Sequence, residues 1–179
     1  VSITADRDVT LNGSVGHVGS YGYSNTDVQI TAGVSRWRGG IHSETSLGGN
    51  ILLEANSSIT GADVDLRTNR PTGAATFTSG NVTQVLGGEI AVTYVTSLHV
   101  QAAGNVDLLG SLDVPNSGVY IYAGYNNTCS ECTNAQVYEG MHITISDLNS
   151  QNTSVTLSAT GPITAAIDGA NQVTASIEN

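Results

Sequence analysis

Cys129 and Cys132 form a Cys-x-x-Cys pair, which is the residue spacing in this sequence that most clearly suggests a chemical role. A Cys-x-x-Cys pair can form a small-loop disulfide, act as a redox pair or supply half of a zinc site. A redox pair should open a helix beside a βαβ unit, but no helical pattern follows it here. A tetrahedral zinc site needs two further ligands, and the four histidines are scattered singly. We therefore predict a structural disulfide, with free thiols as the alternative.

Two acidic pairs, Asp6/Asp8 and Asp63/Asp65, each place two carboxylates on one side of an extended backbone. Clustered aspartates can perform acid–base catalysis on polysaccharides or bind calcium. A calcium loop needs more oxygen ligands than D-x-D supplies, and an anionic sugar needs cations nearby. No G-x-S-x-G motif occurs. We therefore predict neither catalytic residues nor a metal or cofactor site, and keep a polysaccharide-active hydrolase or lyase as an alternative.

Aromatic and arginine side chains form the candidate interaction surface. Tyr120 and Tyr122 alternate with Val119 and Ile121, so both tyrosines should project outward from one strand, close to Tyr125. Tyrosine also decorates exposed β surfaces without binding anything. The full predicted surface for a sugar or protein partner consists of Tyr21, Tyr23, Arg36, Trp37, Arg38, Tyr120, Tyr122 and Tyr125.

Five N-x-[ST] sequons occur in the chain. They are glycosylation acceptors only if the source organism modifies its surface proteins. The candidate residues are Asn12, Asn56, Asn81, Asn126 and Asn152.

Composition restricts the fold and the partners. The 179 residues are enough for one domain with a hydrophobic core. Only 11% of the residues are charged and 5% are aromatic, whereas Gly, Ser, Thr, Asn and Val are abundant. This composition favours many short strands. All five cations are arginines, and the net charge of −10 makes nucleic acid and anionic membranes poor partners. No apolar run approaches the roughly 18 residues of a membrane span.

A five-residue element, aliphatic-x-aliphatic-x-Ala, recurs along the chain. Its copies are VSITA at 1, VQITA at 28, ILLEA at 51, LHVQA at 98, VYIYA at 119 and VTLSA at 155. In four copies another aliphatic residue follows the Ala by four positions: Val9, Ile59, Val106 and Ile163. This is an internal repeat, and we expect a hidden copy between 51 and 98, around IAVTY at 90 or Phe77.

The repeat predicts strands joined by corners. The stretch Leu98–Val114 contains three short alternating runs, with Gly104 and Gly110 at the two expected corners. Repeats of this size are typical of an all-β, single-stranded parallel β-helix (β-solenoid), here with about seven coils and a length of roughly 35 Å. An antiparallel β-sandwich is the alternative. Loop insertions are expected near 16–27, 33–49, 67–88 and 124–141.

Four segments resemble the β-helical repeats of filamentous-haemagglutinin-type exoproteins, the adhesins exported by two-partner secretion. They are VSITADRDVTLNG, GGNILLEANSSITG, LHVQAAGNVDLLG and VTLSATGPITAAI. The resemblance covers about two thirds of the chain. It implies a right-handed parallel β-helix on the bacterial surface.

Both ends of the sequence read as core-facing strands without a polar cap. We expect them to pair with flanking repeats or with other copies of the chain. The leading hypothesis is therefore a non-enzymatic, extracellular structural or adhesive rod that can polymerise into a surface filament, with carbohydrate or a cell-surface protein as an expected further partner. A pilin-like subunit that donates the strand VSITADRDVTLNG is a third hypothesis, beside the enzyme.

Overall fold

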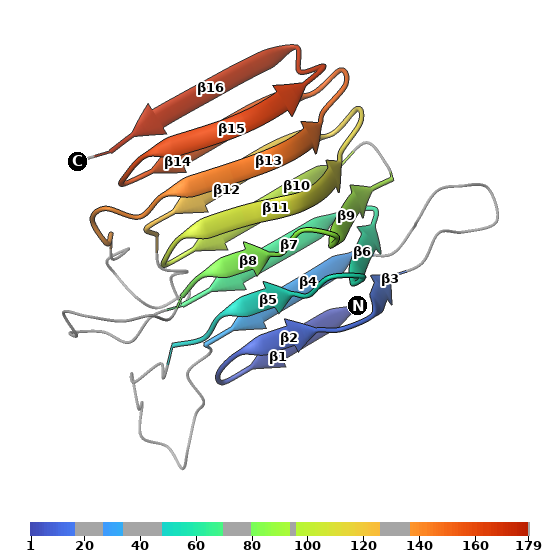
Figure 1. Cartoon of the computed structure of the whole chain (residues 1–179), viewed down its shortest axis with the longest axis vertical. Coiled ribbons are helices and arrows are strands. Elements are labelled where there is room, and N and C mark those ends of the chain that lie inside the picture. The colour runs from blue at the N-terminus through green and yellow to red at the C-terminus, as the bar shows by residue number, and fades with distance from the viewer. Residues whose placement is uncertain (17–26, 34–47, 70–79, 94–95, 126–136, 179) are drawn as a thin grey trace.

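The structure is a computed structural model that describes residues 1–16, 27–33, 48–69, 80–93, 96–125 and 137–178. These residues form sixteen strands, and no helix occurs among them. No helix in this part of the chain is therefore long and apolar enough to cross a membrane. The chain winds into a solenoid with two sheets of parallel strands, sheet A and sheet B, which face each other along the molecule (Figure 1).

Sheet A takes one strand from each coil. In spatial order it contains β1 (Ser2–Ala5), β4 (Val28–Ala32), β7 (Val64–Thr68), β10 (Ser97–Ala102), β12 (Gly118–Ala123), β14 (Ser154–Ala159) and β16 (Gln172–Ile177). The seven strands define about seven coils, which confirms the predicted parallel β-solenoid. Every pairing between named strands is parallel, so the alternative of an antiparallel β-sandwich is wrong.

Sheet B changes its form along the rod. In the first three coils it has two rows of short strands, which both join one long strand in the fourth coil. The first row is β2 (Val9–Leu11), β5 (Ile51–Leu53) and β8 (Val82–Gln84), and the second is β3 (Ser14–Gly16), β6 (Ser58–Gly61) and β9 (Glu89–Val92). The long strands are β11 (Val106–Asp113), β13 (Ile143–Asn149) and β15 (Ile163–Asp168).

Aliphatic columns form the core between the sheets. In sheet A one column runs through Ile3, Ile30, Leu66, Val100, Ile121 and Leu157, which are in register from coil to coil. In sheet B another runs through Val9, Ile51, Val82, Val106, Ile143 and Ile163. Alternating residues point outward, as the period of two predicts.

The structure corrects two predictions about the repeat. The copy ILLEA at 51 is β5 of sheet B, whereas the other five copies lie in sheet A. The hidden sheet A strand is β7 at 64, while IAVTY at 90 contributes to β9 of sheet B and Phe77 lies outside the described residues. Strand β7 does not match the five-residue element, because buried Thr68 occupies the position that Ala holds in neighbouring coils.

The predicted insertion 67–88 is also too long. Arg67 and Thr68 end β7, and β8 lies at Val82–Gln84. Gln84 is buried in a position that leucine holds in the neighbouring coils, at Leu53 and Leu108, and this polar residue hides the alternation.

Gly104 lies at a corner between β10 and β11, as predicted, but Gly110 does not. Strand β11 continues through Gly110, with an irregular register between Leu108 and Ser111. A Cβ on Gly110 would lie 2.2 Å from the carbonyl oxygen of Gly88. The glycine is therefore required for close packing of two coils, not for a corner.

Candidate functional site

A shallow pocket lies on the outer face of sheet A, and we call it the aromatic pocket. Its volume is about 330 Å³. It is lined by His99, Gln101, Tyr122, Tyr125, Ser158 and Glu178.

Register between coils brings the aromatic pocket together. Gln101 on β10 is paired with Tyr122 on β12, and Tyr122 is paired with Ser158 on β14. Each occupies an outward position of its strand, because the residues on either side of it are the buried core positions. Three residues that are far apart in sequence thus form one row across neighbouring strands.

Aromatic rings form one side of the pocket. The centroids of the His99 and Tyr122 rings are 5.7 Å apart, with their planes tilted by 60°. The centroids of Tyr122 and Tyr125 are 6.1 Å apart, and those planes are nearly perpendicular, at 84°. Edge-to-face arrangements of this kind are favourable between aromatic rings. Tyr122 therefore stands between two rings that hold its orientation.

Hydroxyl and carboxylate groups form the other side. The Tyr125 hydroxyl lies 3.1 Å from Ser158 Oγ, and the Ser158 hydroxyl lies 3.4 Å from Glu178 Oε1. Burial and the neighbouring Glu178 carboxylate raise the pKa of Tyr125, although its hydrogen bond with Ser158 acts in the opposite direction. Tyr125 is thus a neutral phenol at physiological pH.

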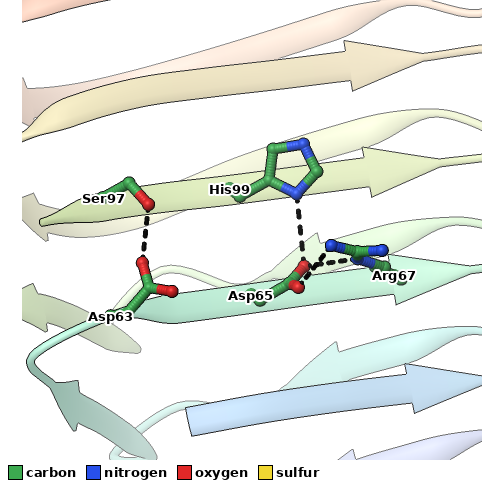
Figure 2. Close-up of polar contacts among 5 residues, drawn as sticks. All are labelled: Asp63, Asp65, Arg67, Ser97 and His99. Carbon is green, nitrogen blue, oxygen red and sulfur yellow. Dashed lines mark hydrogen bonds and ion pairs between the residues drawn. The ribbon is translucent and has the colours of Figure 1, made fainter. Parts of the chain in front are cut away.

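Asp65, on β7 of the preceding coil, binds the imidazole of His99 (Figure 2). Asp65 Oδ1 lies 3.2 Å from His99 Nδ1, and Arg67 binds the same carboxylate with its Nε at 2.8 Å and a terminal nitrogen at 2.7 Å. Burial alone would raise the pKa of Asp65, but the hydrogen bonds from His99 and Arg67 and the Arg67 charge hold this pKa below its ordinary value. Asp65 is therefore an ionised acceptor that orients the imidazole.

The other acidic residues singled out from sequence have separate partners. Asp63 accepts a hydrogen bond from Ser97 Oγ at 2.6 Å, beside the Asp65 cluster in Figure 2. Asp8 Oδ1 accepts hydrogen bonds from the backbone and side-chain nitrogens of Asn50, at 2.7 and 2.9 Å. No group of three or more metal-ligating side chains occurs among the residues described.

Tyr120 lies on the same face but outside the aromatic pocket. It is 39% exposed, and its ring lies against Gly118, where an added Cβ would be 2.6 Å from the ring. The structure thus brings together Tyr122 and Tyr125 of the predicted interaction surface. The remaining members, together with the cysteine pair, lie outside the described residues: Tyr21, Tyr23, Arg36, Trp37, Arg38, Cys129 and Cys132.

The sequon asparagines occupy different environments. Asn12, Asn56 and Asn152 are exposed, whereas Asn126 lies outside the described ranges. Asn81 is half-buried, and its side-chain oxygen accepts the backbone N–H of Asn105 at 2.9 Å. A glycan on Asn81 would therefore have to coexist with a structural hydrogen bond.

Sequence reasoning did not assign His99, Gln101, Ser158 or Glu178 to the site. A signal existed for His99 and Gln101, since both alternate with the apolar residues of LHVQA and so share the outward face with the tyrosines. Their neighbours across the sheet depend on coil length, which local alternation does not reveal.

Comparisons with protein-family models, with curated proteins and with solved structures find no match.

Proposed function

We propose that this protein is an extracellular structural and adhesive rod whose solenoid is extended at its ends. The observation that carries the proposal is the uninterrupted parallel ladder of sheet A, which reaches its outermost strands β1 and β16. Each of these has another described strand of the sheet on one side only. Such an edge presents backbone N–H and C=O groups that pair with a further strand.

The apolar positions of β16 support this proposal. Val173 and Ile177 are 50% and 57% exposed, whereas their counterparts on β14, Val155 and Ala159, are buried. A further coil placed on β16 would bury both side chains, and burial contributes about 25 cal/mol per Å² of apolar surface. Flanking repeats or a second copy of the chain could provide that coil.

Side-chain sizes favour a second copy. On β16, Ala175 and Ile177 continue the columns of Leu157 and Ala159, so the order of large and small residues is reversed. If β1 of another copy followed in register, Ile3 would lie on Ala175, and Ala5 would lie on Ile177. Both of these contacts would then pair a large residue with a small one, which fills space without overpacking.

The enzymatic and pilin-like alternatives have less support. Glu178 is the carboxylate that lines the aromatic pocket, and nearby Asp65 is engaged by Arg67, whereas glycoside hydrolysis needs two carboxylates flanking one bond. The strand-donation hypothesis required antiparallel pairing, and β1 pairs with β4 in parallel. The rod is therefore the function that these contacts support best.

Negative-stain electron microscopy and light scattering over a range of concentrations test self-stacking. We expect filaments or concentration-dependent oligomers of this chain. Ala175→Asp should suppress them, because it places a charge in the contact, while the matched outward substitution Thr174→Asp should not. Monomers alone at every concentration, or equal behaviour of the two variants, would contradict stacking through β16.

A further inference from the structure

We propose that the aromatic pocket binds a neutral carbohydrate. The inference rests on the proposed adhesive function, since it names the class of partner and the place where that partner binds. It is carried by three properties of the pocket: its aromatic surface, its hydroxyl-binding groups and its charge.

The aromatic surface suits a sugar ring. The Tyr122 and Tyr125 planes are nearly perpendicular, so together they present an angled apolar surface and not a flat one. The C–H face of a pyranose is apolar and packs on aromatic rings, while its hydroxyls point to the side. The volume of about 330 Å³ lies at the low end of small-molecule sites, which suits a ligand of one or two rings.

Polar side chains line the pocket beside this aromatic surface and can form hydrogen bonds with the hydroxyls of a sugar. Asp65 engages Nδ1 of His99, which leaves Nε2 on the opposite side of the imidazole (Figure 2). Ser158 and the Glu178 carboxylate are linked at 3.4 Å, a separation at the weak limit of a hydrogen bond. A ligand hydroxyl can therefore donate a hydrogen bond to the Glu178 carboxylate, and hydrogen bonds to charged groups are the stronger ones.

Charge selects a neutral ligand over an acidic one. Glu178 lines the pocket and Asp65 lies beside it, whereas the neighbouring cation Arg67 is already paired with Asp65 at 2.7 Å. The chain as a whole carries a net charge of −10. Uronic acids and sulfated sugars would therefore be repelled, both at the site and during approach.

Titration of the isotope-labelled protein with defined oligosaccharides tests the proposal. Two-dimensional NMR would follow the amide resonances of His99, Gln101 and Tyr122 during addition of neutral hexose and N-acetylhexosamine oligomers, and of matched uronic-acid oligomers. We expect saturable shifts at these residues with at least one neutral oligomer and at least tenfold weaker binding of the acidic oligomers.

Variants separate a specific site from general surface binding. Tyr122→Ala should weaken binding about tenfold or more, because it removes the central ring, whereas Tyr120→Ala removes an aromatic residue of the same strand outside the pocket and should leave affinity unchanged. Thermal unfolding of both variants checks that each is folded. If Tyr122→Ala does not fold, Tyr125→Phe serves in its place, with weaker binding expected because it removes the hydroxyl that contacts Ser158.

Several results would overturn the inference. They are the absence of shifts with every neutral oligomer in the panel, a preference for acidic oligomers, and equal losses in Tyr122→Ala and Tyr120→Ala. Capture of a protein through this face with no glycan requirement would also count against it. Filament formation is tested separately by microscopy, so a failure of sugar binding can be distinguished from a failure of the proposed rod.

Discussion

Asn105 donates its backbone N–H to the side-chain oxygen of Asn81, at 2.9 Å, across two adjacent coils. Asn81 in turn donates its own N–H to Asn50 Oδ1 at 3.0 Å, and Asn50 donates to Asp8 at 2.7 Å. Each of these residues immediately precedes a strand of sheet B. The result is a ladder of side chains that satisfies corner N–H groups, which the stacked strands would otherwise leave without acceptors.

Removal of one rung should destabilise the solenoid. Asn81→Ala leaves the Asn105 N–H without its acceptor, so we expect the free energy of unfolding to fall by about 1–3 kcal/mol. Urea denaturation measures the change. Asn12→Ala, at an exposed position between β2 and β3, should change stability by less than about 0.5 kcal/mol. Equal effects of the two substitutions would show that the ladder contributes nothing.

Stability at acid pH should depend on Asp65. Because its folded pKa is lowered from 3.8, its ionised form stabilises the native state fully above about pH 3.8, and this contribution is lost as the pH falls through the lower folded pKa. Asp65→Asn should therefore be less stable than the wild type at neutral pH, with the difference shrinking on acidification. Denaturation curves at several pH values measure it. A difference that does not vary with pH, or the same pattern in the exposed control Glu89→Gln, would refute this role.

Truncation of a buried side chain in a core column should destabilise the fold. Ile121 is fully buried between Val100 and Leu157 of the adjacent coils, so Ile121→Ala should reduce the free energy of unfolding by about 2–5 kcal/mol. Leu86 is 80% exposed, and Leu86→Ala should be nearly neutral. Chemical denaturation of both variants measures the contrast. A small effect of Ile121→Ala would contradict its place in the core.

A side chain at position 110 should destabilise the solenoid. Gly110→Ala would bring a Cβ to 2.2 Å from the Gly88 carbonyl oxygen, so β11 must shift from the preceding coil, and we expect a loss of about 1–3 kcal/mol. The adjacent exposed substitution Ser111→Ala should have little effect. Thermal unfolding provides the comparison. An unchanged melting temperature for Gly110→Ala would indicate that the two coils are not packed this closely.

The local alternation of apolar and polar residues was enough to predict much of the fold. The elements VSITA, VQITA, LHVQA, VYIYA and VTLSA all lie in sheet A, as one repeated strand should. ILLEA has the same pattern but lies in sheet B, because both sheets face the same core and require the same alternation. Strands β7 and β8 were not predicted from the repeat, because Thr68 and Gln84 are polar residues at buried core positions and break the apolar alternation.

The candidate site was less accessible to sequence reasoning. Alternation correctly put Tyr120 and Tyr122 outward, but it could not show that Tyr122 belongs to a pocket while Tyr120 lies on Gly118. The contacts of Tyr122 with His99 and Tyr125 depend on which residues neighbouring coils place beside it. Ser158 and Glu178 enter the same pocket from later coils for that reason.

The sequence by itself determined the repeating alternation, the aliphatic core and hence the parallel solenoid. These are local properties, because every strand that faces the core needs an apolar residue at every second position. Only the tertiary structure decided which residues become neighbours, since coils differ in length: stacked partners are 18 residues apart at Ser158 and Ser176 but 36 apart at Asp113 and Asn149. The aromatic pocket depends on that stacking, because its side chains come from segments that meet only when the coils are in register.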